Sequence, residues 1–351
     1  MVEYIDNSKI GVLIIGSLPP PLGGTAVSLY HLVNYLNSRN DINVYIVNTG
    51  YIKSSNYYLF IKKLFNDLKM VLYYTRKSDI ITLHIGTRSL PYFGIIILII
   101  SKIFGKPLIV RKFNGTDTYD LKLVEKYLSH IIIKKSNLYL AQTKQLVQSA
   151  SQKGISHVKW LPTSRNMAKL NNVQKNNKCR KYIFLGQVRK QKGVPQLLKA
   201  ADRMPIDVII DVYGPLGYDI KIEMFMNNKT NYKGIVEPDN VTELLMNYDV
   251  LVLPTYHPGE GYPGVIMEAF SAGIPVITTR WKSIPELIDD KTGILVKPMN
   301  VESLYLAMLK LYNNSQLYLE LKKGILAKRK KFSSDIWNNF FVEHCKKLKA
   351  D

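Results

Sequence analysis

Apolar and polar residues in the first half of the chain alternate between short apolar runs and longer stretches with helical spacing. The clearest run, residues 9–16, is rich in Ile, Leu and Val and bounded by polar residues, as expected for a buried parallel strand. Strands that alternate with helices indicate a parallel sheet covered on both faces. Further strands are predicted at residues 43–48, 79–85, 109–113 and 138–142.

The second half repeats this α/β pattern after an interruption. Residues 163–180 are rich in Asn, Lys and Ser and have little apolar periodicity, whereas strands recur at residues 181–186 and 207–214. With 351 residues the chain can form two full hydrophobic cores. We therefore predict a first domain (1–163), a linker (164–180), a second domain (181–330) and a final helix (331–351).

The most specific motif lies in residues 254–277, where a predicted strand leads through a loop rich in Gly and Pro into a helical run. Glu260 and Glu268 stand in this segment with seven residues between them. A helix that begins near Gly264 would direct its free amides and positive dipole end toward the loop, which favours an anion. Because two carboxylates repel a bare phosphate, the motif fits a ligand that carries hydroxyls as well as phosphate.

Residues 248–277 resemble the donor-site signature of the retaining glycosyltransferases of family four, also called glycosyl transferases group 1. The resemblance implies the GT-B fold, in which two Rossmann-like domains have parallel sheets facing across a cleft, and a final helix that packs back on the first domain. It also implies that Glu260 lies by the donor sugar and that Glu268 accepts hydrogen bonds from the nucleotide ribose. The adjoining donor-site positions that it implies are Gly261, Tyr262, Pro263, Gly264 and Val265.

A cluster of cations follows the first predicted strand of the second domain. Positive charge there would stabilise a departing nucleoside diphosphate, because negative charge accumulates on its oxygens as the glycosidic bond breaks. The family has a Gly-Arg pair followed by Lys-Gly; Lys192 and Gly193 match, whereas Gln187 stands at the usual arginine. We expect Arg189 to supply the missing charge. If Arg189 points to solvent, the stabilisation depends more heavily on Lys192.

Three positions of the first domain are further candidates. Asn114 stands where the family often has a histidine near the donor sugar; an amide can donate a hydrogen bond but does not titrate near neutral pH. That suits a role in polarity and shape rather than in proton transfer. His84 ends another predicted strand, and a structural histidine is the simpler interpretation. Asp117 is a candidate contact to the acceptor.

Three loops complete the site that the resemblance implies. Gly23 and Gly24 precede a helical pattern, so their amides could meet a phosphate, and they match the family's glycine loop near the donor diphosphate and the acceptor. The GlyXaaGlyXaaXaaGly fingerprint of dinucleotide-binding proteins does not occur in this first loop, residues 16–28. In the second domain the order of the family motifs places two pairs of residues near the nucleotide base: Tyr213 with Gly214, and Val236 with Glu237.

The net charge of +21 is spread over both halves, because residues 1–160 contain 20 Lys and Arg against 8 Asp and Glu. Such a charge attracts nucleic acid, anionic lipid or anionic substrates. No zinc-finger or aromatic RNA-binding signature occurs, so we do not expect a nucleic-acid partner. Residues 59–77 place apolar side chains among lysines at helical spacing, which could lie on an anionic membrane surface. An amphipathic helix packed on its own domain is the simpler interpretation.

Several features bear on the compartment. Cys179 and Cys345 lie far apart and match no metal-binding spacing, which predicts a reducing, cytoplasmic environment. The first nine residues contain acids and no apolar core, unlike a secretory signal. The uncharged run in residues 90–104 stops at Lys102, short of the ~20 apolar residues of a spanning helix, so a buried helix is expected. Peripheral association with the inner face of the membrane stays an open alternative.

The sequence thus predicts retaining, metal-independent transfer of a sugar from a nucleotide-sugar, with UDP favoured by the resemblance. No Asp-Xaa-Asp triplet occurs, so side chains and helix amides would take the place of a metal, and no cofactor is expected. Glu260, Lys192, Arg189 and Asn114 would act in catalysis. The expected acceptor is a glycan or a lipid-linked oligosaccharide in bacterial cell-surface polysaccharide synthesis.

Two alternatives stay open. An enzyme similar to glycogen phosphorylase or to an epimerase can share the fold, but the pyridoxal lysine signature of the former is not recognisable. The second alternative is a non-catalytic basic GT-B scaffold that binds membrane or another anionic partner. The carboxylate pair argues against a scaffold, because binding alone does not require Glu260 and Glu268 in a glycine-rich segment.

Overall fold

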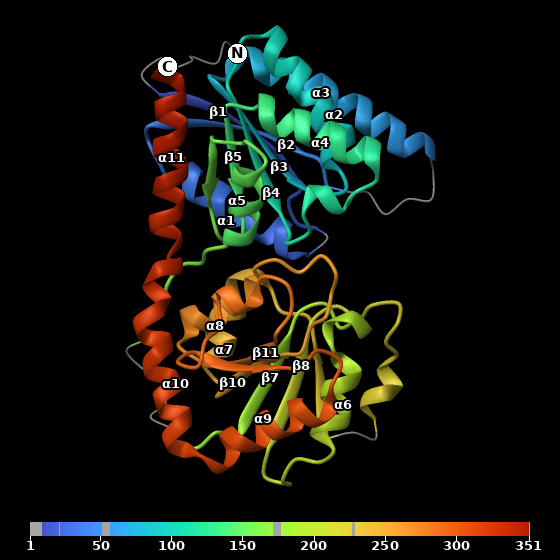
Figure 1. Ribbon diagram of the computed structural model, residues 1–351, viewed down its shortest axis with the longest axis vertical. Helices are drawn as coiled ribbons and strands as arrows, with labels where there is room; N and C mark the ends of the chain where they lie inside the picture. Colours follow the sequence, from blue (N-terminus) through green and yellow to red (C-terminus); the bar gives the residue numbers. More distant parts are fainter. Residues whose placement is uncertain (1–8, 21, 51–56, 171–176, 227–228, 351) are drawn as a thin grey trace. The chain divides into compact units, whose positions relative to one another are not determined.

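The computed structural model describes residues 9–20, 22–50, 57–170, 177–226 and 229–350. The chain forms two compact α/β units, each built on one six-stranded parallel sheet (Figure 1). The first unit consists of Met1–Pro162 with Ile336–Asp351, and the second of Thr163–Asp335. The predicted α/β class is confirmed.

The sheet of the first unit has the strand order β2-β1-β3-β4-β5-β6. The five strands predicted from apolar runs are present, each within one residue of its expected bounds. The edge strand β6 was not predicted, because three residues are too few to leave an apolar pattern. The strands are β1 (Ile10–Gly16), β2 (Ile42–Asn48), β3 (Ile80–Gly86), β4 (Leu108–Phe113), β5 (Leu138–Ala141) and β6 (Val158–Trp160).

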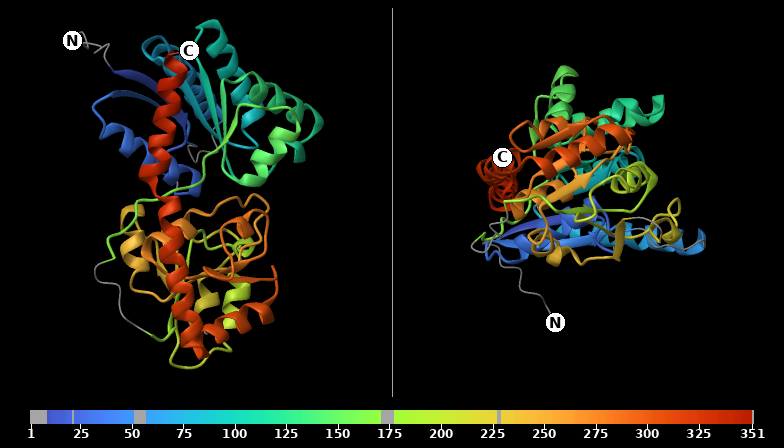
Figure 2. Two further views of the ribbon diagram at one scale, coloured as in Figure 1. Left: turned by 60° about the vertical axis from the view of Figure 1, so that its left-hand side comes forward. Right: turned by 90° about the horizontal axis from the view of Figure 1, so that it is seen from below.

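Helices cover both faces of this first sheet. Helices α2 to α5 share one apolar core with one face, while α1 and the residues of α11 from Ile336 on share a second core with the other face. Figure 2 shows α11 running alongside the first sheet. The helices are α1 (Gly24–Asn37), α2 (Tyr57–Lys77), α3 (Leu90–Ile103), α4 (Leu123–Lys135), α5 (Lys144–Gln152) and α11 (Ser334–Ala350), with a 3-10 turn η1 (Thr118–Asp120).

The second unit has the strand order β12-β11-β10-β7-β8-β9. Its strands are β7 (Lys181–Leu185), β8 (Ile209–Tyr213), β9 (Thr230–Gly234), β10 (Val250–Leu253), β11 (Val276–Thr279) and β12 (Gly293–Val296). Its helices are α6 (Val194–Ala201), α7 (Val241–Leu245), α8 (Gly264–Ala272), α9 (Val301–Asn313) and α10 (Ser315–Lys328). Its 3-10 turns are η2 (Lys190–Lys192), η3 (Ile222–Phe225), η4 (Pro238–Asn240), η5 (Ile284–Glu286) and η6 (Arg329–Phe332).

The strand order of the second sheet changes direction beside β7. From β7 the chain adds β8 and β9 on one side, and then returns to add β10, β11 and β12 on the other. The loops after β7 and β10 therefore diverge at the carboxyl edge of the sheet, which is where open α/β sheets bind ligands. The cation cluster follows β7 and the carboxylate loop follows β10, so the topology brings these two motifs together.

Residues 163–170, which the composition places in a linker, have contacts within the second unit. The main chain of Arg165 forms a parallel β-bridge with Ser333, and its side chain is buried. The amide of Ala168 donates to the hydroxyl of Ser271 at 3.0 Å. This segment therefore packs as part of the second unit.

Within the described residues, no helix is both long enough and apolar enough to cross a bilayer.

Candidate functional site

The carboxylate loop occupies the connection between β10 and α8. Helix α8 begins at Gly264, as the loop pattern predicts, and no described side chain caps its N-terminus. Its first amides therefore depend on other partners, and its positive dipole end faces the loop. Gly261, Tyr262 and Pro263 lie in the loop just before this helix, and the Tyr262 hydroxyl donates to Glu286 at 2.5 Å.

Glu260 joins the two loops that diverge beside β7. Its Oε2 accepts hydrogen bonds from the ammonium group of Lys192 and from the hydroxyl of Thr255, both at 2.6 Å. The Glu260 side chain is only 8% exposed, so the ion pair with Lys192 lies in a shielded environment. Gly193 permits this approach: it has φ +80°, and a Cβ there would stand 2.1 Å from the carbonyl oxygen of Pro254.

Glu268 is held by a different cation, from the segment that enters the second unit. Arg165 Nε donates to Glu268 Oε1 at 2.8 Å, and the two side chains are 4% and 10% exposed. The guanidinium lies against the first turn of α8, because a Cβ on Gly264 would stand 2.4 Å from Arg165 Nη2. Glycine at position 264 is therefore needed for close packing against Arg165.

One oxygen of each acid is held by a cation: Oε2 of Glu260 by Lys192, and Oε1 of Glu268 by Arg165. The orientation of each carboxylate is therefore set before any ligand binds. Such carboxylates are suited to accept hydrogen bonds from sugar hydroxyls, while the paired cations reduce repulsion toward a phosphate.

Arg189, the other candidate cation, points toward the loop that follows β8. Its Nη2 donates to the hydroxyl of Tyr218 at 3.1 Å, and its guanidinium lies 4.9 Å from the centre of the Tyr218 ring. The Asp219 carboxylate is 4.0 Å from Arg189 Nε. Gln187 is exposed. Of Gln187, Arg189 and Lys192, it is Lys192 whose side chain contacts Glu260.

Tyr213 ends β8 at the same edge of the sheet, and Gly214 follows it. The Tyr213 hydroxyl lies 3.2 Å from that of Tyr248, which donates to Asp211 at 2.6 Å. Burial and the hydrogen bond to Asp211 raise the pKa of Tyr248, so its phenol keeps its proton. Gly214 has φ +130°, and a Cβ there would stand 1.8 Å from the carbonyl oxygen of Gly186. The loops after β7 and β8 thus pass in direct contact.

The remaining second-unit candidates follow β9 and begin α8. Val236 is half-buried, whereas Glu237 is exposed and stands at the start of the turn η4. Both lie on the loop after β9, at the carboxyl edge of the sheet beside β8. Val265 is the second residue of α8 and is half-buried.

In the first unit, Gly23 and Asn114 follow β1 and β4 and so lie at one edge of that sheet. Gly23 is the N-cap of α1, Gly24 begins the helix, and no described side chain caps it. Asn114 has φ +68°, and its Oδ1 accepts from Thr87 Oγ1 at 2.5 Å. The ammonium group of Lys112 donates to the same threonine at 3.0 Å. Burial lowers the pKa of Lys112 to about 8.

His84 and Asp117 have structural partners within the first unit. The His84 ring is buried between Phe113 and Phe341, and burial, with the charge of Arg111, holds its pKa well below the usual range. These contacts are those of a core histidine, the simpler of the two interpretations. Asp117 accepts a hydrogen bond from Ser149 at 2.5 Å.

Sequence reasoning missed Arg165 and Thr255, which hold the two acids. Arg165 stands in a polar stretch without periodicity, and Glu268 comes 103 positions later, so no local signal links them. Thr255 is the second residue after β10, and that position was the available signal. Within the described residues, no three His, Cys, Asp or Glu side chains gather closely enough to hold a metal ion.

Comparisons with known proteins agree with the resemblance found in the sequence. The family model described as glycosyl transferases group 1 matches residues 166–327. The chain is 26% identical to O-antigen chain mannosyltransferase B of Escherichia coli over 168 residues, which is 45% of this chain and 42% of that protein. It is 30% identical to a sulfoquinovosyl transferase of Arabidopsis thaliana over 34% of this chain and 24% of that protein. The chain thus matches less than half the length of these relatives.

Solved structures extend the likeness to both units. The structure of Anabaena HepE in complex with UDP has a TM-score of 0.76 at 15% identity and covers 96% of this chain and 100% of its own. Sucrose-phosphate synthase from Thermosynechococcus elongatus has a TM-score of 0.76 at 13% identity, covering 97% and 100%. At such low identity the likeness concerns the fold, and it confirms the predicted GT-B class.

Proposed function

We propose that this chain, a member of the group 1 glycosyltransferases with the GT-B fold, transfers a sugar from a nucleotide-sugar donor to a hydroxyl of an acceptor. The observation that carries the proposal is the shielded Lys192–Glu260 pair at the point where the second sheet changes direction. A ligand bound there meets a cation, a fixed carboxylate and the N-terminus of α8 within one loop cluster.

Each group has a role in the proposed reaction. Lys192 and the first amides of α8 bind the diphosphate and stabilise its negative charge as the bond to the sugar breaks. Oε1 of Glu260 accepts from a hydroxyl of the donor sugar and opposes the positive charge of an oxocarbenium-like transition state. Oε2 of Glu268 accepts from the ribose, as the family resemblance implies. Arg189 is a weaker contributor, because its guanidinium is engaged with Tyr218.

We further propose retention of configuration through attack on the same face, without a metal ion. A UDP-sugar is the proposed donor; structures of HepE, which share this fold, contain UDP or UDP-glucose. The proposed acceptor is a glycan or lipid-linked oligosaccharide of a bacterial cell-surface polysaccharide. In support, a relative in Escherichia coli is named for the O-antigen chain. The reaction would take place in the cytoplasm at the inner face of the membrane.

Donor hydrolysis and binding test the proposal without knowledge of the acceptor. The purified chain is screened against common nucleotide-sugars by thermal shift, because a bound ligand stabilises the folded state. Proton NMR of the released sugar then reports whether the first anomer formed is that of the donor. We expect stabilisation by one donor class, slow hydrolysis with retention, and loss of hydrolysis in Glu260→Gln.

The matched control is Glu302→Gln, which removes an exposed carboxylate of the same unit that is ion-paired to Arg203. This variant should hydrolyse the donor at the wild-type rate. If no nucleotide-sugar stabilises the protein and none is hydrolysed, the chain is not a transferase and a binding scaffold becomes the better explanation. Release of the inverted anomer would refute retention while leaving sugar transfer intact.

A further inference from the structure

Most of the exposed large apolar side chains described in the first unit lie on three of its helices, α2, α3 and α4. Of the fourteen exposed large apolar side chains described in this unit, seven lie on α2, three on α3 and three on α4. The fourteenth is Ile336 on α11, and the described parts of α1 and α5 contribute none. Large exposed apolar patches mark interaction sites. We call the solvent side of these three helices the α2–α4 face.

Helix α2 shows how this face is built. Val71 is fully buried against the sheet, so the opposite side of the helix is solvent-facing. Tyr58, Ile61, Phe65 and Leu72 are all exposed, and their spacing of three, four and seven residues aligns them in one stripe along the helix. An amphipathic helix that packs only on its own domain would carry polar residues at these positions.

Basic residues run beside the apolar stripe. Lys62, Lys69 and Arg76 follow one another at intervals of seven, so they form a second row along α2. Helices α2, α3 and α4 together carry nine Lys and Arg against two acids, a net charge of +7. The two acids are already bound to neighbours on the same face: Asp67 is ion-paired within α2, and Glu125 accepts from a tyrosine hydroxyl of α3.

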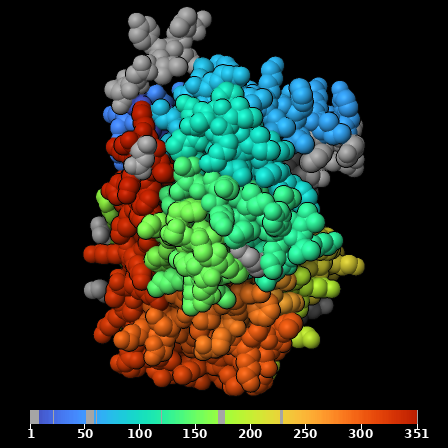
Figure 3. All heavy atoms as spheres, turned by 45° about the horizontal axis from the view of Figure 1, so that its top comes forward, coloured from blue at the N-terminus to red at the C-terminus, as the bar shows by residue number. Residues whose placement is uncertain are grey.

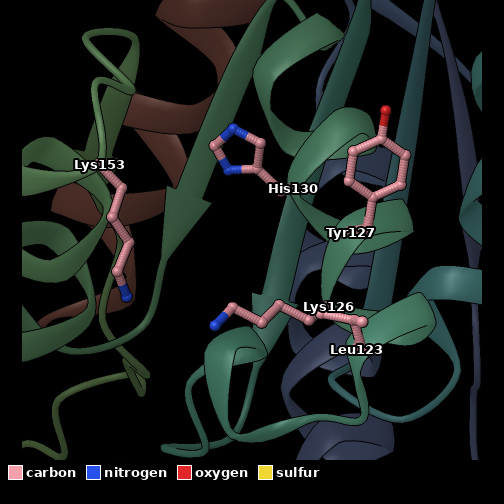
Figure 4. A pocket seen from close by; sticks show the side chains of 5 residues that line it. All are labelled: Leu123, Lys126, Tyr127, His130 and Lys153. Carbon is pink, nitrogen blue, oxygen red and sulfur yellow. The ribbon is translucent and has the colours of Figure 1, made fainter.

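The face continues from α2 across α3 to α4. The guanidinium of Arg76 lies 5.1 Å from the centre of the Phe104 ring, which follows α3 directly, and residues of the three helices adjoin on one surface (Figure 3). Beside α4 lies an open hollow of about 290 Å³ lined by Leu123, Lys126, Tyr127, His130 and Lys153. Figure 4 shows the amino groups of its two lysines directed toward one space.

We propose that the α2–α4 face docks this protein on a bilayer that contains anionic lipids. The apolar stripe would enter the headgroup region, and the basic row would lie against the lipid phosphates. A second copy of the chain is a poor occupant, because two such faces would oppose +7 against +7. Nucleic acid fits less well, because its outer surface of phosphates offers no apolar partner to the stripe. The inference rests on the proposed function only in that the acceptor would be lipid-linked.

Vesicle co-sedimentation measures the docking directly. The full chain is mixed with vesicles of phosphatidylcholine alone or with added phosphatidylglycerol, at low and high salt. We expect binding that requires phosphatidylglycerol and weakens with salt. Ile61→Ser/Phe65→Ser/Leu72→Ser should reduce the partition coefficient at least about tenfold. Lys62→Gln/Lys69→Gln should reduce it about 25-fold, from about fivefold for each charge near an anionic leaflet.

The matched control replaces three exposed apolar residues of the second unit, as Ile206→Ser/Leu306→Ser/Leu326→Ser. This variant likewise exchanges three exposed apolar side chains for serine and should bind vesicles like the wild type. Hydrolysis of a soluble nucleotide-sugar is measured in parallel for every variant, because the α2–α4 face has no part in the donor site. Unchanged hydrolysis also shows that the variants are folded.

The design distinguishes outcomes that refute membrane docking from outcomes that refute sugar transfer. Binding that is equal on neutral and anionic vesicles, or that is lost to the same degree in the control, overturns the proposal. Concentration-dependent dimerisation in sedimentation velocity that disappears in the α2 triple variant also overturns it, since a second copy would then cover the face. Vesicle binding without donor hydrolysis upholds the docking inference and counts against the proposed enzyme.

Discussion

Arg165 should be one of the most sensitive positions of the second unit, because its removal leaves Glu268 as an unpaired charge in a nearly dry site. The side chains are 4% and 10% exposed and 2.8 Å apart. Breaking a buried ion pair by removing one partner typically costs ~3–5 kcal/mol. We therefore expect Arg165→Met to lower the free energy of unfolding of the second unit by about that amount. The double variant Arg165→Met/Glu268→Gln should lose less, because it leaves no buried charge.

The structure supplies both a control and a reporter for this experiment. The exposed pair Arg203–Glu302 also joins two parts of the second unit, but its side chains are 43% and 57% exposed. Arg203→Met should therefore cost at most ~1 kcal/mol. Trp281 is the tryptophan of the second unit, and its indole donates to the carbonyl of His257 at 2.8 Å. Replacing the other two tryptophans by Phe makes its fluorescence specific for this unit during urea unfolding.

A small effect would refute the argument. If Arg165→Met and Arg203→Met change the unfolding free energy equally, the Arg165–Glu268 pair is not a buried interaction of consequence. A second measurement separates stability from ligand positioning. Arg165→Lys keeps the positive charge but loses the planar guanidinium that fixes Oε1 of Glu268. Its donor kinetics are measured at a temperature below the unfolding transition. We expect it to raise the KM for the donor more than it lowers kcat.

Three further predictions follow from individual contacts. Lys192→Gln should lower kcat for hydrolysis of the nucleotide-sugar by roughly 10²–10³, because it removes a hydrogen-bond donor to a developing anion. Arg189→Gln should lower kcat by less than about tenfold, because its guanidinium is engaged with Tyr218. Initial rates measure both effects. Gly264→Ala places a Cβ 2.4 Å from a guanidinium nitrogen and should lower the free energy of unfolding by ~1–3 kcal/mol. Gly24→Ala should not lower it, because the space around a Cβ at that position is open. Thermal unfolding measures both variants. Burial lowers the pKa of Lys112 to about 8 in the folded state, against 10.5 in the unfolded state. Below about pH 8 the folded chain therefore bears the full cost of a buried charge, at most about 3 kcal/mol. The free energy of unfolding should rise as the pH increases from about 8 to 10.5. Lys112→Met should abolish that rise in urea titrations at about pH 7 and about pH 10; an unchanged rise would contradict it.

The sequence determined the secondary structure and its alternation. The run at Ile10–Gly16 predicted a strand because both faces of a central parallel strand are buried, and the loop pattern placed the start of α8 at Gly264. It also placed the cations after β7 and the carboxylates after β10. These signals are local, since backbone conformation follows from the periodicity of apolar residues and from glycine within a few positions.

Only the tertiary structure decided which side chains meet. Nothing near Arg165 indicates Glu268, and Arg189, expected to help hold the diphosphate, turns instead to Tyr218 on the neighbouring loop. The pattern of α2 likewise shows two apolar sides, but burial of Val71 decides which of them faces solvent. Side-chain partners depend on distances between elements far apart in sequence, and packing of the whole sheet sets those distances. The sequence therefore fixes the elements of the site, while packing fixes the orientation of its charges.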